Sequence, residues 1–169
     1  MIKNNGVIGV IVIFITIILQ STILSEVSVR GIKPDFVLIM IILFANYSGR
    51  MKGQILGFTM GLVQDFLSLA PLGFNALINT TIGYLSGATS GKIFLDPIVV
   101  PMVFVLIGTF LKSTLAYFLL SIFLIDKADT IFTSKLLIEL SLNVVITPLL
   151  YLFFKIIKVF PSSLNARLS

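Results

Sequence analysis

The sequence predicts an all-α fold, a polytopic membrane bundle of about six transmembrane helices, and three observations lead to it. Hydrophobic residues make up 57% of the 169 residues, charged residues make up only 11%, and the mean hydropathy is +1.13. A soluble domain of this length buries about two-thirds of its surface and could not hide so much apolar area from water. The apolar residues also gather in long runs between short polar connectors, which is typical of helices that cross a bilayer.

Six apolar runs approach or exceed the length that spans a bilayer, and we predict one helix from each. They cover residues 7–24, 34–47, 53–69, 74–90, 98–124 and 136–157. The first run follows a lysine but lacks a small-residue cleavage site, so we interpret it as a retained signal anchor. No connector is long enough to hold a soluble domain, so residues 1–169 are predicted to form a single transmembrane domain.

The later spans differ in length and in their helix-breaking residues. The second is short and begins at Pro34, and the third and fourth are joined only by residues 70–73, which predicts a tight antiparallel hairpin. The fifth is the longest, and we expect it to tilt or to protrude from the membrane. Pro148 lies within the sixth, where it predicts a bend and leaves the carbonyl group near Val144 without its helical partner.

Lysine and arginine are distributed unequally between the two sides of the predicted bundle. The side that contains both termini carries Lys3, Arg50, Lys52, Lys92, Lys155, Lys158 and Arg167. The other side carries Arg30, Lys33, Lys127 and Lys135, together with the acidic residues Glu26, Asp35, Asp126 and Asp129. Because Lys and Arg accumulate on the cytoplasmic side of membrane proteins, both termini are predicted to face the cytoplasm.

Two glycine ladders give the third and fourth spans one smooth stripe each. Glycines recur every four residues, at Gly49, Gly53, Gly57 and Gly61 and then at Gly83, Gly87 and Gly91. Small residues let helix backbones approach closely in lipid, so each stripe is a candidate packing surface. The spacing alone leaves open whether the stripes meet inside the bundle or face a separate partner.

Three ionisable residues interrupt the apolar spans: Asp65 in the third, Lys112 in the fifth and Glu139 near the outer start of the sixth. A charge at the bilayer centre costs roughly 2.5–3.5 kcal/mol on insertion scales, so each is expected to face the interior and find a partner. A rise of about 1.5 Å per residue places Asp65 and Lys112 both in the outer half of the membrane, and we expect them to form an ion pair. Neutral hydrogen bonds nearby are expected from Asn75, Asn79 and Asn143.

This polar cluster also has a functional alternative. Carboxylates inside membranes often mark transport paths, so the cluster could bind a substrate or relay protons instead of linking helices. We favour the structural interpretation.

The composition argues against most enzyme chemistry. Cysteine and histidine are absent, which removes disulfides, thiolate and histidine catalysis, and most transition-metal sites. A Ser–Lys dyad of Lys112 with Ser113 or Ser86 is formally possible, but we predict no enzyme, no catalytic residue, no metal and no cofactor. The net charge is +5, and the basic residues lie at the ends of apolar runs rather than in a basic patch. The lipid bilayer is therefore an expected partner, and nucleic acid is not.

Four short motifs lie along the second, third and fourth spans. They are Pro34-Asp35, then Gly57-Phe58 with Gly61-Leu62 and Asp65, then Pro71-Leu72-Gly73 with Ala76-Leu77, and finally Gly83-Tyr84. With the chain length, the number of spans and the very short C-terminal tail, these motifs resemble the MreD family, small polytopic rod shape-determining proteins of bacteria.

The resemblance implies a non-enzymatic inner-membrane subunit of the cell-elongation machinery. In that role it would be held beside MreC and linked indirectly to MreB, to RodA and to the penicillin-binding transpeptidase of RodA. The family is also similar in fold to the substrate-binding subunits of energy-coupling-factor vitamin transporters, and such a subunit is the alternative function. That alternative predicts small residues on the first helix, often Ala-x-x-x-Ala, whereas residues 7–19 are mostly bulky and β-branched and the chain has no tryptophan.

These observations give one set of candidate structural or interaction residues. The set comprises Asp65, Lys112, Glu139, Asn75, Asn143, Gly53, Gly57, Gly61, Gly83, Gly87, Pro34, Asp35 and Gly73. We expect Gly57, Gly61 and Asp65 to be architectural rather than chemical. A partner's single helix is expected to lie in a groove lined either by glycines or by lipid-facing aliphatic residues of one terminal helix.

Overall fold

The computed structural model describes residues 31–68, 70–90, 99–122 and 134–156, and these fold into five helices. The helices are α2 (Phe36–Ser48), α3 (Arg50–Leu67), α4 (Phe74–Gly87), α5 (Val99–Ile122) and α6 (Ser134–Ile156). The predicted all-α fold is confirmed for this part of the chain. The first predicted span, residues 7–24, lies outside the described residues, so the count of six spans stays a prediction.

The observed helix ends differ from the predicted span limits by up to three residues. α3 begins at Arg50 rather than at residue 53, because backbone hydrogen bonding continues through polar residues that hydropathy assigns to a loop. α2 begins at Phe36, after Asp35, whose side chain caps the helix. Pro148 lies inside α6 as predicted, while the bend expected from it remains a prediction.

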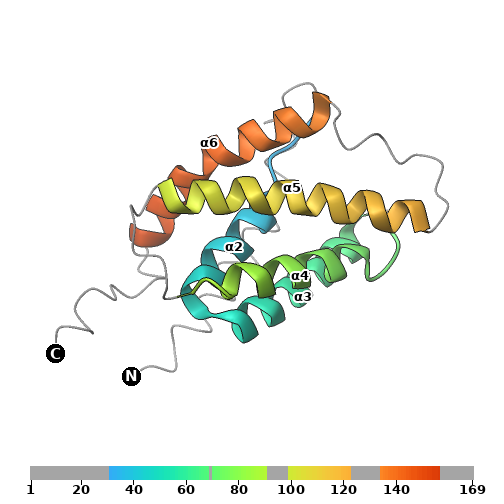
Figure 1. Ribbon diagram of the computed structural model, residues 1–169, viewed down its shortest axis with the longest axis horizontal. Coiled ribbons are helices and arrows are strands. Elements are labelled where there is room, and N and C mark those ends of the chain that lie inside the picture. The colour runs from blue at the N-terminus through green and yellow to red at the C-terminus, as the bar shows by residue number, and fades with distance from the viewer. Residues whose placement is uncertain (1–30, 69, 91–98, 123–133, 157–169) are drawn as a thin grey trace.

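α2 is the central helix of the described bundle. It contacts all four other helices and passes between the α3–α4 pair on one side and the α5–α6 pair on the other (Figure 1). A helix that is apolar all round lies in a protein core or in lipid, away from water. The residues of α2 that are buried are Val37, Leu38, Ile39, Met40, Ile41, Ile42, Leu43 and Ala45.

α2 is shorter than a typical helix that crosses a bilayer. Its 13 residues rise about 20 Å, whereas the hydrocarbon core of a bilayer is about 30 Å thick. α2 is therefore shorter than such a core, and its first turn lies within the bundle rather than at the bundle's end (Figure 1).

Two helices, α5 over residues 99–122 and α6 over residues 134–154, are long and apolar enough to cross a membrane. Few residues of either helix are fully buried, and many of the exposed side chains are large and apolar. They include Val103, Leu106, Ile107 and Phe118 on α5 and Leu137, Val145, Leu149 and Phe153 on α6. Such surfaces suit contact with lipid tails or with another membrane helix.

α3 and α4 form the antiparallel hairpin that the short connector predicted, and their backbones pack directly against each other. A side chain at Gly57 would overlap the backbone of Asn79, and one at Gly61 would overlap that of Ala76. Gly53 and Gly83 face each other in the same way, and Gly87 lies against the backbone of Arg50. The glycine ladders therefore meet each other inside the bundle, which answers the question that the spacing left open; Gly91 lies outside the described residues.

Candidate functional site

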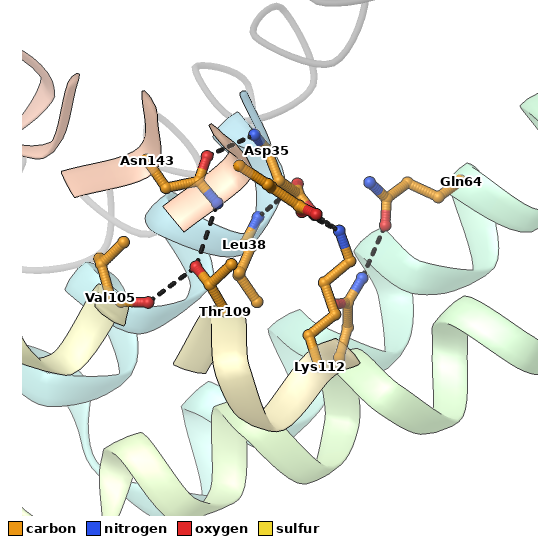
Figure 2. Close-up of polar contacts among 9 residues, drawn as sticks. Asp35, Leu38, Gln64, Val105, Thr109, Lys112 and Asn143 are labelled. Carbon is orange, nitrogen blue, oxygen red and sulfur yellow. Dashed lines mark hydrogen bonds and ion pairs between the residues drawn. The ribbon is translucent and has the colours of Figure 1, made fainter. Parts of the chain in front are cut away.

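Three charged side chains inside the described bundle, those of Asp35, Lys112 and Glu139, meet at one place, which we call the charge cluster. The Nζ atom of Lys112 donates to Oδ2 of Asp35 at 2.7 Å and to Oε1 of Glu139 at 2.8 Å. Figure 2 shows the Lys112 side chain extending from α5 toward Asp35 at the start of α2. Since Glu139 lies on α6, this single ammonium group links three helices.

Asp35 has two further roles besides its ion pair. Its Oδ1 atom accepts a hydrogen bond from the backbone N–H of Leu38 at 3.0 Å, which satisfies one of the free donors in the first turn of α2. Its own backbone N–H donates to Oδ1 of Asn143 on α6 at 2.8 Å. The preceding residue, Pro34, is fully buried and has no N–H to satisfy. The Pro34-Asp35 motif thus begins a helix within an apolar interior and leaves no backbone donor of this pair unpaired.

A neutral hydrogen-bond chain extends the charge cluster between α5 and α6. The Nδ2 atom of Asn143 donates to Oγ1 of Thr109 at 3.0 Å, and the Thr109 hydroxyl donates to the carbonyl of Val105 at 2.8 Å (Figure 2). The hydroxyl of Thr147 donates to the carbonyl of Asn143 at 2.6 Å. Asn143, Thr109 and Thr147 are completely buried, so both ends of the Asn143 amide have partners where water does not reach.

The predicted ion pair between Asp65 and Lys112 is wrong. Asp65 instead accepts three backbone N–H groups at the start of α4, from Gly73 at 2.9 Å, Asn75 at 2.8 Å and Ala76 at 3.1 Å. Depth along the membrane was the basis of the prediction, but depth does not say which side of α3 carries the residue. The side that carries Asp65 faces α4, whose unpaired first-turn donors and positive dipole end attract a carboxylate.

The three asparagines of the predicted polar cluster are separated in the structure. Asn143 joins the charge cluster, as expected, but the side chain of Asn79 donates to Oε1 of Gln64 at 2.7 Å, within the α3–α4 pair. Asn75 contributes its backbone N–H to Asp65. A sequence signal for the true partners of Lys112 was present, because Asp35 and Glu139 both stand near the outer ends of spans and an Asp before an apolar run is a typical helix cap.

Loss of the Asp65 carboxylate is expected to loosen the α3–α4 hairpin. Hydrogen bonds to charged groups contribute about 1.5–3 kcal/mol each, and Asp65→Asn keeps one acceptor but turns an NH₂ group toward backbone donors. We expect a loss of about 3 kcal/mol of unfolding free energy, measured by thermal unfolding of the purified protein in detergent. Thr81→Ala, at a half-buried position of α4, is the matched control and should change stability by less than about 0.5 kcal/mol, because its hydroxyl hydrogen bond lies at the surface. An Asp65→Asn protein as stable as the parent would contradict this capping role.

The charge cluster is arranged to hold helices together. Its lysine is engaged by two carboxylates, so the Ser–Lys dyad considered from the sequence would have to break two ion pairs to obtain a base. Within the described ranges, no group of three or more His, Cys, Asp or Glu side chains is placed to hold a metal ion. The two ion pairs of Lys112 connect the middle of α5 to the start of α2 and to the first half of α6.

Comparison with known proteins finds one matching protein family. The family model described as rod shape-determining protein MreD matches residues 2–157 of the chain. No curated protein and no solved structure matches it.

Proposed function

The chain belongs to the MreD family of rod shape-determining membrane proteins, and from this premise we propose that it is a non-enzymatic subunit of the bacterial cell-elongation complex. In this proposal it binds MreC and supports the localisation or regulation of peptidoglycan synthesis. Its links to MreB, to RodA and to the penicillin-binding transpeptidase are indirect. It lies in the inner membrane as a multi-pass protein with both termini in the cytoplasm.

The observation that carries the proposal is the family match, which extends over residues 2–157 of the 169. Two features of the described helices support a binding role. The charge cluster and the glycine contacts give the bundle a fixed internal frame. The outer faces of α5 and α6 are apolar, of membrane-spanning length and mostly uncovered, as expected of a protein that presents helices to other helices in lipid.

We expect MreC to co-purify with the tagged protein from native membranes in a mild detergent, accompanied by RodA and its transpeptidase at lower yield. Mass spectrometry of the eluate measures this, and membranes that contain an unrelated tagged multi-pass protein provide the background. Enrichment of MreC of about tenfold or more over that background supports the proposal. Recovery of paired ATPases with a coupling membrane protein, and no MreC, would replace it with the vitamin-transporter function.

A further inference from the structure

α6 carries a second stripe besides the one that faces α2 and α5. Starting at Glu139, residues at alternating spacings of three and four form what we call the α6 seam: Glu139, Leu142, Ile146, Leu149 and Phe153. This spacing keeps side chains on one side of a helix and is the pattern by which one helix packs along another. The buried stripe of α6 is a different set, Leu136, Asn143, Thr147 and Phe154.

The last two residues of the α6 seam are exposed, whereas the first three are half-buried. Leu142 and Ile146 are half-buried, whereas Leu149 is 66% exposed and Phe153 is 53% exposed. The seam therefore lies at the edge of the bundle, where it touches the described helices on one side and is open on the other. A membrane helix laid against this edge would bury both large side chains.

The charge cluster at the outer end of the α6 seam has an excess of negative charge. Two carboxylates share one ammonium group, so the three contacting side chains sum to −1. Lys135, four residues before Glu139, is not part of these two ion pairs. Among the described residues, only the Oε1 atom of Glu139 receives a hydrogen bond, and the side chain is 20% exposed. A carboxylate inside a membrane is stabilised by nearby positive charge, so a cationic group from outside the bundle would be favoured beside Glu139.

We propose that the α6 seam docks one transmembrane helix of a single-span partner, and that this helix places a Lys or Arg side chain beside Glu139. The inference rests on the proposed function, in which MreC is the partner, and on the single partner helix that the sequence analysis expects. The apolar positions give the contact area, and the one charged position fixes the register, as a polar residue does at a coiled-coil seam. It also favours the second of the two grooves expected from the sequence, the one lined by aliphatic residues of a terminal helix. Five ladder glycines are already occupied by contacts within the α3–α4 hairpin and with the end of α2: Gly53, Gly57, Gly61, Gly83 and Gly87.

The absence of cysteine from the chain allows a site-directed cross-linking test. Leu149→Cys is labelled with a benzophenone maleimide in native membranes, illuminated, and its adducts are identified by mass spectrometry. Ile107→Cys is the position control, because Ile107 is 54% exposed and lies at a similar distance from the same end of the bundle, but on α5. We expect an adduct with a single-span protein from position 149 and at least tenfold less from position 107.

Variants at Glu139 test the charge. In the Leu149→Cys background, Glu139→Gln should reduce the adduct about tenfold, which corresponds to about 1.4 kcal/mol, while Glu139→Asp should retain most of it. Glu139→Lys should lose the adduct and regain it when the basic residue of the cross-linked partner is changed to Glu. Regain by this exchange cannot come from a merely structural effect of Glu139 on the fold.

Several outcomes would overturn the inference. They are equal adducts from positions 107 and 149, an adduct of position 149 with residues 7–24 of the same chain or with a second copy, no protein adduct, and no effect of Glu139→Gln. If MreC co-purifies with the parent protein and any of these results is found, the proposed function stands and the α6 seam is wrong. If MreC does not co-purify at all, the proposed function itself fails.

Discussion

Replacement of Gly57 by alanine is expected to cause the largest loss of stability of any single methyl group added to this protein. A Cβ atom at Gly57 would overlap the backbone carbonyl of Asn79, and backbone atoms cannot move aside unless α3 and α4 separate along their whole contact. Overpacking typically costs 1–3 kcal/mol where side chains adjust, so we expect about 3 kcal/mol or more here. At about 2–4 °C per kcal/mol, thermal unfolding in detergent should shift by roughly 10 °C.

Gly108→Ala is the matched control for this prediction. The new methyl group at position 108 would also meet an atom at short distance, but that atom is Cδ1 of Ile42, the far end of a flexible side chain. We expect a loss of at most about 1 kcal/mol, because Ile42 can change its rotamer. Gly61→Ala should behave like Gly57→Ala, since its methyl group would meet the backbone of Ala76. Equal effects at positions 57 and 108 would show that the two helix backbones are not in direct contact.

Lys112→Met is expected to be the most damaging substitution among the charged residues. It leaves the carboxylates of Asp35 and Glu139 facing each other without a cation, and breaking one partner of a buried ion pair typically costs about 3–5 kcal/mol. The triple variant Asp35→Asn, Lys112→Met, Glu139→Gln should recover most of that loss, because all three side chains become neutral and asparagine still caps α2. Thermal unfolding in detergent, together with the yield of monodisperse protein, measures both effects.

A pair of double-mutant cycles distinguishes the observed ion pair from the one that the sequence suggested. Asp35→Asn combined with Lys112→Met should give a coupling energy above about 1 kcal/mol, because the two side chains are in contact. Asp65→Asn combined with Lys112→Met should be additive within about 0.5 kcal/mol, because the hydrogen bonds of Asp65 go to the start of α4. Strong coupling of Asp65 to Lys112 would contradict the arrangement of the charge cluster.

Features that depend only on the order and spacing of residues along the chain were predictable from the sequence. The helices follow apolar runs, the connector before Gly73 forces a hairpin, and the four-residue glycine spacing identifies faces of close approach. The turn at Gly73 is also such a feature. Its backbone is left-handed, with φ of 95°, at the start of α4, and glycine adopts that conformation without steric cost.

The partner of each buried charge was not predictable in the same way. Hydropathy gives the depth of a residue in the membrane, but an ion pair also depends on how each helix is rotated about its axis. Asp65 and Lys112 are both assigned to the outer half, yet Asp65 faces the backbone of α4 while Lys112 faces the start of α2. Asp35 was assigned to the side opposite the termini because it opens the predicted span of residues 34–47. The four helices packed around α2 allow it to begin inside the bundle rather than at the surface. This packing depends on residues that are far apart in the sequence.

The early placement of α2 in the chain has a consequence for biosynthesis. Asp35 is made 77 residues before its cation Lys112 and 108 residues before Asn143, the acceptor of its backbone N–H. At about 5–20 residues per second, ribosomes leave the start of α2 without these contacts for roughly 5–20 s. During that interval α2, the most apolar of the described helices, has an acidic N-cap that lacks both its cation and the acceptor of its backbone N–H. Assembly of this protein therefore finishes from its C-terminal half, and a chain truncated before α5 would expose Asp35 to quality control.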